Sequence, residues 1–137
     1  MAEFCQMDRH APRKPLVLVL EDEAIIALNL HDELQEAGYR VAGPFTTCAA
    51  ALEWLQAATP DMAILDAALK DGPCREIALE LSNRAVPFLI YSGHREDRQL
   101  LADFHHVAWI EKPIPPSVLV EACRDLLACC DHTTSMK

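Results

Sequence analysis

The chain has 137 residues and a formal net charge of −9, with 51% hydrophobic and 24% charged residues. This length fits one domain, and we expect no separate output or catalytic domain beside it. The composition is typical of a globular protein, and the acidic balance argues against a nucleic-acid-binding surface, which needs clustered positive charge. No hydrophobic run approaches the ~18 residues of a membrane-spanning helix, so we expect no membrane segment.

Six cysteines are present, but none of them has the spacing of a zinc site or of a small disulfide-rich fold. The first 15 residues are mixed and polar, without the hydrophobic stretch of a secretory signal. We therefore predict a cytoplasmic protein whose thiols are reduced.

Short hydrophobic runs alternate with segments of helical periodicity. Residues 16–20 (LVLVL) are typical of a strand covered on both faces. Helical spacing follows over residues 24–37, and Gly38 is expected to end that helix. The later strands are predicted at Tyr39–Ala42, Met62–Leu65, Val86–Tyr91 and Val107–Ile110. Gly43–Pro44 is expected to end the second strand, which begins at Tyr39.

The remaining helices have recognisable starts. Thr46 or Thr47 can cap the second helix, and Pro73 stands where a first helical turn accepts proline. A fourth helix is predicted over residues 95–104, and Ser117 is expected to cap the last.

Successive predicted strands begin 21 to 24 residues apart, and each interval holds one strand and one helix. We therefore predict an α/β fold: a (βα)5 doubly wound parallel five-stranded sheet of order 2-1-3-4-5, flavodoxin-like. The domain is expected to span residues 15–130. Residues 1–14 are expected to form a disordered N-terminal arm, and residues 131–137 a C-terminal tail.

Polar side chains follow four of the five predicted strands. Glu21 and Asp22 follow the first, Asp66 the third, Ser92 the fourth and Lys112 the fifth. In the predicted order the first and third strands are neighbours, so the three carboxylates should lie together, where their oxygens suit Mg²⁺. With Lys112 and Ser92 beside them, these groups could accept a phosphoryl group, Asp66 attacking phosphorus. Taken singly, each residue also fits an ordinary helix start, turn or loop.

Four motifs stand in order at these strand ends: LVLVLEDE, MAILD, LIYSG and WIEKP. Through them, residues 15–130 resemble a response-regulator receiver domain of two-component signalling. The resemblance implies that Asp66 is the phosphoacceptor and that Glu21 and Asp22 form the acidic pair that binds Mg²⁺. The backbone carbonyl of Ala68 would complete the metal site. Glutamate in the place of Glu21 is one methylene longer than the more usual aspartate, so we expect it to reach the metal through water.

The same resemblance assigns a conformational switch. Ser92 matches the switch hydroxyl and Lys112 the family's lysine, and the Lys112–Pro113 peptide bond is expected to be cis. Trp109 stands at the aromatic switch position. In this family the switch changes the surface formed by the fourth helix, the fifth strand and the fifth helix. A homodimer would form through the same surface.

The finer pattern, LVLEDEAIIALNLHDELQEAGYRVAGP followed by VPFLIYSG, resembles receivers paired with HWE and HisKA2 histidine kinases. The implied partners are such a kinase or a histidine phosphotransfer protein, and a downstream protein. Neither a nucleic acid nor a membrane is implied.

We expect a phosphorylation-dependent switch that passes the phosphoryl group on or changes partner binding. It would not be an enzyme beyond its own phosphorylation and dephosphorylation. Two alternatives remain open: a pseudo-receiver that binds protein without phosphorylation, and a receiver fragment of a hybrid histidine kinase. A haloacid-dehalogenase-type phosphatase is disfavoured, because that family needs a second aspartate two residues after its nucleophile. Here Ala68 occupies that position.

Overall fold

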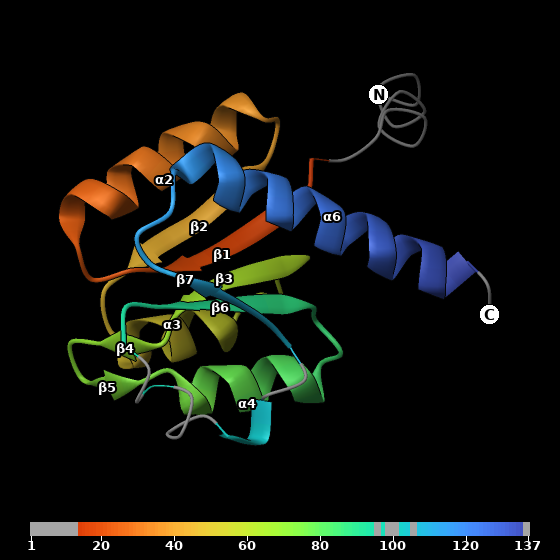
Figure 1. The fold of residues 1–137 in the computed structure, drawn as a ribbon. Coiled ribbons are helices and arrows are strands. Elements are labelled where there is room, and N and C mark those ends of the chain that lie inside the picture. The colour runs from red at the N-terminus through yellow and green to blue at the C-terminus, as the bar shows by residue number, and fades with distance from the viewer. Residues whose placement is uncertain (1–13, 95–96, 98–101, 105–106, 136–137) are drawn as a thin grey trace, which may run out of the picture.

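The computed structural model describes residues 14–94, 97, 102–104 and 107–135 (Figure 1). Its main sheet has five parallel strands in the order β2-β1-β3-β6-β7. Since β6 and β7 are the fourth and fifth strands of this sheet along the chain, the predicted order 2-1-3-4-5 is confirmed. The strands are β1 (Leu16–Leu20), β2 (Arg40–Phe45), β3 (Met62–Asp66), β6 (Phe88–Ser92) and β7 (Ala108–Glu111).

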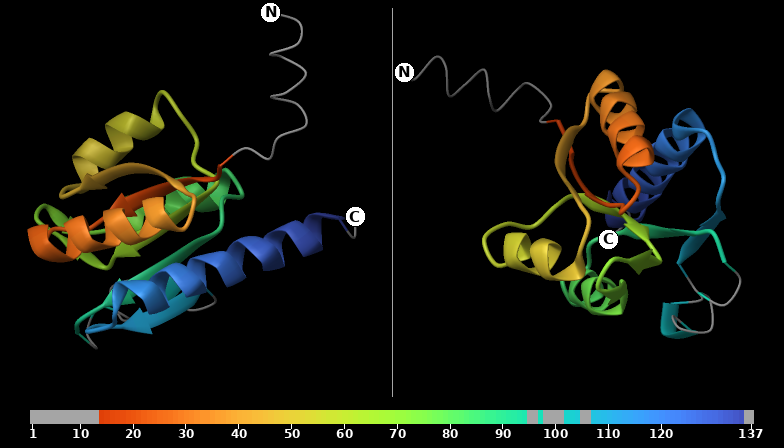
Figure 2. Two further views of the ribbon diagram at one scale, coloured as in Figure 1. Left: turned by 90° about the horizontal axis from the view of Figure 1, so that it is seen from above. Right: turned by 90° about the vertical axis from the view of Figure 1, so that its left-hand side faces the viewer.

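Helices cover both faces of the sheet. Figures 1 and 2 show α2 and α6 on one face and α3 and α4 on the other, as a doubly wound sheet requires. The helical elements are α2 (Ala24–Glu36), α3 (Cys48–Leu55), α4 (Arg75–Asn83), the short 3₁₀ helix η1 (Ala102–Phe104) and α6 (Pro116–Ser135).

The continuous hydrophobic strands follow from this layering. In β1, Leu18 and Leu20 pack in the cluster beneath α3 and α4, whereas Val17 and Val19 pack in the cluster beneath α2 and α6. Every residue of β3 and β6 is buried. Because both faces of a parallel sheet are covered, its strands need apolar side chains at successive positions and not only at alternate ones.

Two glycines shape the first βαβ unit. Gly38 adopts φ +96°, and the Tyr39 N–H donates to the Leu34 carbonyl at 3.0 Å, so α2 ends as predicted. The prediction that Gly43–Pro44 ends the second strand is wrong, because β2 continues to Phe45. Gly43 adopts φ +101°, and a Cβ there would lie 2.7 Å from the Val19 carbonyl oxygen, so glycine permits the irregular register with β1.

The start predicted for the third helix is also wrong. Pro73 lies in β5 (Gly72–Pro73), which pairs antiparallel with β4 (Ala68–Leu69). The Cys74 N–H donates to the Ala67 carbonyl across this hairpin, and α4 begins only at Arg75. The chain therefore turns back on itself directly after β3 before the helix forms.

The caps of the other helices differ from one another. Thr47 caps α3 as predicted, since its side chain accepts from the Ala50 N–H at 3.2 Å. Ser117 is not a cap, because α6 begins one residue earlier, at Pro116, and the Val118 N–H donates to the Pro115 carbonyl. This helix runs to Ser135, past the domain end expected at residue 130.

Three sequence predictions fall wholly or partly on residues outside the described part. The predicted helix over residues 95–104 lies largely there, and its described end forms η1. The proposed dimer face includes that helix, and the N-terminal arm also lies outside the description, except for Lys14.

Arg84 joins α3 to α4. Its guanidinium donates to the Leu55 carbonyl at 2.7 Å, the Ala58 carbonyl at 3.0 Å and Thr59 Oγ1 at 2.9 Å. It also pairs with Glu80, one turn earlier on α4. One side chain thus satisfies carbonyl groups left free at the C-terminal end of α3.

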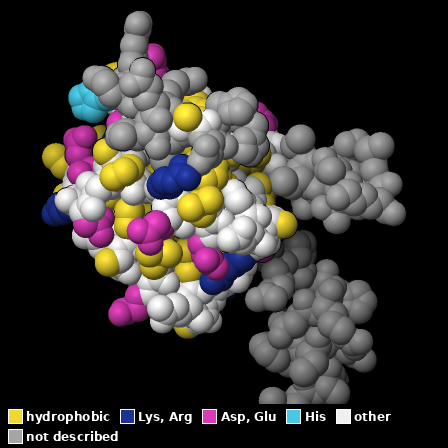
Figure 3. Space-filling model, turned by 90° about the horizontal axis from the view of Figure 1, so that it is seen from below, with side chains coloured by type: hydrophobic (Ala, Val, Ile, Leu, Met, Phe, Trp, Pro, Cys, Tyr) yellow, Lys and Arg dark blue, Asp and Glu magenta, His cyan; other side chains and the backbone are white. Residues whose placement is uncertain are grey.

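The described surface agrees with the acidic composition. In Figure 3, which views the molecule from the side of α4, Lys and Arg side chains are interspersed among Asp and Glu, and the described residues visible on this face form no basic patch. Within the described ranges, none of the helices combines the length and hydrophobicity needed to cross a membrane. Cys48, Cys74 and Cys123 are free thiols.

Candidate functional site

The predicted site residues meet at the carboxyl end of the sheet. Glu21 and Asp22 follow β1, Asp66 ends β3, Ser92 ends β6 and Lys112 follows β7. Strands β1, β3 and β6 are adjacent, so their last residues lie side by side. The last residues of parallel strands all lie at the same end of the sheet. Motifs far apart in the chain therefore meet here.

Three carboxylates form the centre of the site. Glu21, Asp22 and Asp66 each offer one oxygen within 4.8 Å of the others. Glu21 is 0% exposed and Asp66 4% exposed, whereas Asp22 is half-buried. Burying like charges at this distance is unfavourable unless a cation joins them.

Lys112 supplies part of that positive charge. Its Nζ lies 3.0 Å from Asp66 Oδ2 and 3.3 Å from Glu21 Oε1. The Lys112 N–H donates to the Ser92 carbonyl at 2.8 Å, which anchors the backbone at the end of β6. Burial lowers the pKa of Lys112, but the contacts with Asp66 and Glu21 outweigh it and raise that pKa overall. The lysine therefore remains charged at neutral pH.

Asp66 is fixed through both of its oxygens. Lys112 donates to Oδ2, and the Ala68 N–H donates to Oδ1 at 3.2 Å. Burial raises the pKa of Asp66 to about 7, and the charge of Glu21 adds to this effect while Lys112 opposes it. A buried, partly compensated carboxylate of this kind is typical of a functional site.

Glu21 is satisfied entirely by protein groups. Its Oε1 accepts a hydrogen bond from the Tyr91 hydroxyl, and its Oε2 accepts from the Glu23 N–H at 2.8 Å. Burial raises the pKa of Glu21, but these hydrogen bonds and the charge of Lys112 together lower it below its ordinary value. Sequence reasoning missed Tyr91. The available signal was a hydroxyl-bearing side chain in an otherwise apolar strand, one residue before Ser92.

Ser92 turns its hydroxyl toward its own loop. Its Oγ donates to the Asp97 carboxylate and lies 2.8 Å from the His94 carbonyl oxygen, and it accepts from the His94 N–H at 3.2 Å. Among the described residues, no hydrogen bond joins Ser92 Oγ to Asp66. Asp97 is buried, and sequence reasoning missed it because it belongs to no strand end.

The other predicted switch residues lie close by. The Lys112–Pro113 bond is cis, as expected, and the Gly43–Pro44 bond is also cis. Half-buried Trp109 packs against the cluster beneath α3 and α4, and its Nε1–H donates to the Phe104 carbonyl at 2.9 Å. Its switching role and the metal-binding role of the Ala68 carbonyl stay predictions.

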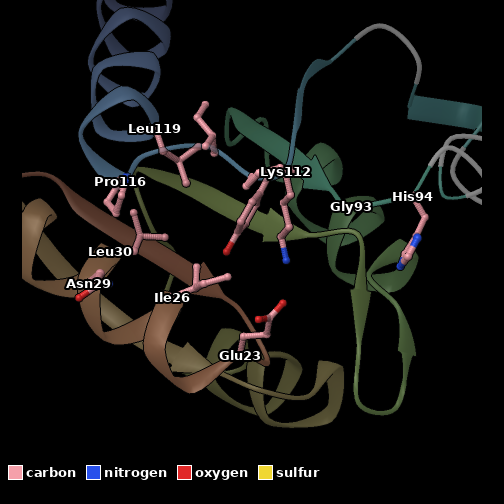
Figure 4. A pocket seen from close by; sticks show the side chains of 12 residues that line it. Glu23, Ile26, Asn29, Leu30, Gly93, His94, Lys112, Pro116 and Leu119 are labelled. Carbon is pink, nitrogen blue, oxygen red and sulfur yellow. The ribbon is translucent and has the colours of Figure 1, made fainter.

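A cavity of about 460 Å³ lies next to Lys112, and neither Glu21 nor Asp22 lines it. Figure 4 shows Lys112 reaching into it opposite Glu23 and Ile26 of the α2 side. Tyr91 and Leu119 also line the cavity, and Asp66 does not. The cavity thus lies between α2 and the start of α6, beside the site.

The donor set fits a hard divalent cation. All the side-chain ligands available in the cluster are carboxylate oxygens, and Mg²⁺ is usually held by one or two carboxylates and several waters. Asp22 and Asp66 could hold such an ion. Glu21 differs from these two residues, because both of its oxygens already accept hydrogen bonds from protein groups.

Known proteins share this fold. The chain is 30% identical over 118 residues to the transcriptional regulatory protein PdtaR of Mycobacterium tuberculosis, covering 84% of this chain and 57% of that protein. The chain thus spans a little over half the length of this relative. The solution structure of SdrG from Sphingomonas melonis Fr1 matches with a TM-score of 0.71 and 29% identity, over 85% of this chain and 99% of that one.

A receiver domain protein (CheY-like) from Methanospirillum hungatei JF-1 matches in fold, with a TM-score of 0.77 and 20% identity, over 88% of this chain and 99% of that one. The model of the response regulator receiver domain family matches residues 17–124, which include every residue of the site. The chain therefore belongs to the response regulator receiver domain family.

Proposed function

We propose that this chain is a phosphorylation-dependent switch of a two-component system, with Asp66 as the phosphoacceptor. The observation that carries this proposal is the contact between Lys112 Nζ and Asp66 Oδ2 at 3.0 Å, beside two further carboxylates. A lone buried carboxylate would need only one counter-charge. The excess negative charge here suits a site that also receives a divalent cation.

In the proposed reaction, an Asp66 oxygen forms a bond to phosphorus while the bond from phosphorus to the donor's histidine nitrogen breaks. The bonding electrons leave with that nitrogen. Such transfers depend mainly on positioning and charge neutralisation. Lys112 and the Ala68 N–H hold the carboxylate in place. Bound Mg²⁺ would supply positive charge to the phosphoryl oxygens, and Asp22 and Asp66 would hold it.

The proposed output uses the groups around Asp66. Ser92 would turn from Asp97 toward the phosphoryl group, and Trp109 would respond on the neighbouring strand. The phosphoryl group then passes to a histidine phosphotransfer protein, or the altered surface binds a downstream protein. We propose a histidine kinase of the HWE or HisKA2 type as the donor, on the strength of the sequence pattern. The chain would catalyse only its own phosphorylation and dephosphorylation.

The test is a Phos-tag mobility assay of the full chain with MgCl₂ and either acetyl phosphate or phosphoramidate, which carries a P–N bond. We expect a shifted band for the wild type that EDTA prevents. Asp66→Asn should abolish the shift. The matched control Asp125→Asn, which changes an exposed aspartate on α6, should retain it.

A wild type unshifted by both donors would favour the pseudo-receiver. A shift retained in Asp66→Asn would place the phosphoryl group on another residue. Either result would overturn the assignment of Asp66.

A further inference from the structure

Tyr91 contacts the two charged groups that flank Asp66. It is the partner of Asp66 in the β3–β6 register and is 1% exposed. Its hydroxyl donates to Glu21 Oε1, and Lys112 Nζ lies 4.7 Å from the centre of its ring. A buried aromatic ring beneath an ammonium group attracts it and limits where it can move. One side chain therefore influences both Glu21 and Lys112.

The hydrogen bonds on Glu21 oppose a role as a metal ligand. Distance alone would permit three ligands, since one oxygen of Glu21 lies within 4.8 Å of oxygens of Asp22 and Asp66. However, Oε1 already accepts from Tyr91 and lies 3.3 Å from Lys112 Nζ, and Oε2 accepts from a backbone N–H. A rotation of Glu21 that aims Oε1 at a metal would leave the buried Tyr91 hydroxyl without a partner, which is unfavourable.

We infer that Tyr91 is a positioning residue that holds Glu21 out of the metal's coordination shell. Mg²⁺ would then be bound by Asp22 and Asp66, while Glu21 acts as the partner of Lys112. This inference rests on the proposed function, because it concerns the same metal. The difference in burial agrees with it: Asp22 is half-buried and can reach a hydrated ion, whereas Glu21 has no exposed surface.

The decisive variant is Tyr91→Phe, which removes the hydroxyl and retains the ring beneath Lys112. Without the hydroxyl, Glu21 can turn toward the metal as a third carboxylate ligand. We expect Mg²⁺ affinity, measured by isothermal titration calorimetry, to rise by about tenfold, because a third carboxylate adds negative charge to the ligands of the ion. Tyr39→Phe is the matched control, because Tyr39 is also buried but lies directly before β2, at the opposite end of the sheet.

A double-mutant cycle tests whether Glu21 is the group that causes the gain in Mg²⁺ affinity in Tyr91→Phe. Glu21→Gln should weaken Mg²⁺ binding much less than Asp22→Asn in the wild-type background. In the Tyr91→Phe background, Glu21→Gln should abolish the gain in affinity. Thermal unfolding of each variant without Mg²⁺ checks that the fold is retained. If Tyr91→Phe does not fold, the comparison of Glu21→Gln with Asp22→Asn still decides whether Glu21 is a metal ligand, and equal losses would overturn the inference.

Unchanged Mg²⁺ affinity in Tyr91→Phe would overturn the inference, as would equal losses in Glu21→Gln and Asp22→Asn. Either result would leave the proposed function intact, provided that Asp66→Asn still weakens Mg²⁺ binding and prevents phosphorylation. If the Asp66 and Asp22 variants bind Mg²⁺ as well as the wild type does, the proposed function itself fails.

Discussion

The Ser92 hydroxyl and the Asp97 carboxylate are hydrogen-bonded partners at the end of β6, and both side chains are buried. The Ser92 hydroxyl has one proton to donate, and it donates that proton to the Asp97 carboxylate. A phosphoryl group on Asp66 would have to compete with Asp97 for that proton. Hydrogen bonds to charged acceptors are stronger than those between neutral groups, so this competition should be measurable.

We expect Asp97→Ala to speed phosphorylation of Asp66 by acetyl phosphate by up to about tenfold, because the Ser92 hydroxyl becomes available to the incoming group. The rate of appearance of the shifted band measures this. The double variant Ser92→Ala/Asp97→Ala should lose the gain. Equal rates in the wild type and Asp97→Ala would show that the hydrogen bond does not restrain the hydroxyl.

Lys112→Ala should destabilise the fold in EDTA by about 2–4 kcal/mol, since Asp66 and Glu21 would remain buried without their cation. We expect the variant to retain Mg²⁺ binding and to regain part of its Tm when Mg²⁺ is added, because the ion restores positive charge. Thermal unfolding with and without Mg²⁺ provides the measurement. Lys14→Ala, at an exposed position before β1, serves as the control. A Lys112 variant as stable as the wild type in EDTA would contradict this account.

The raised pKa of Asp66, about 7, predicts how stability depends on pH. An unfolded aspartate ionises near pH ~4, so between these values the folded chain binds the proton more tightly than the unfolded chain. The stabilisation by that proton is complete below pH ~4 and is lost as the pH rises through about 7. Asp66→Asn carries no such charge. In EDTA it should exceed the wild type in stability by about 1–3 kcal/mol at pH 8, and match it at pH 4.

Urea unfolding of both proteins at the two pH values tests this, with Asp125→Asn as the control. A stability difference that does not change with pH would show that the Asp66 carboxylate ionises at its ordinary value.

Arg84→Met should lower the free energy of unfolding by about 2–3 kcal/mol, because the carbonyl groups of Leu55 and Ala58 would lose their donor. Arg84→Lys should recover little of this loss, since an ammonium group cannot reproduce the fork of the guanidinium. Arg124→Met changes an exposed arginine on α6 and should have little effect. Chemical denaturation measures all three variants, and a neutral Arg84→Met would mean that the ends of α3 and α4 are held together by packing alone.

The sequence alone determined the sheet, its strand order and the convergence of Asp66, Asp22 and Lys112. These follow from the alternation of strands and helices and from the polar residues that end the strands. Such signals are local, since a strand buried on both faces must be apolar and its last residue reaches the edge of the sheet. The same local reasoning failed at Gly43–Pro44 and Pro73. In both places contacts with other strands decided the backbone.

Which polar groups satisfy one another within the site depends on the tertiary fold. Tyr91 and Glu21 are 70 residues apart and meet because β6 and β1 both neighbour β3. Ser92 and Asp97 are only five residues apart, but that spacing does not by itself bring their side chains together. A residue's type shows which hydrogen bonds it can make. Which of them it makes depends on the partners that the fold brings within reach, because a buried polar group must find its partner inside the protein.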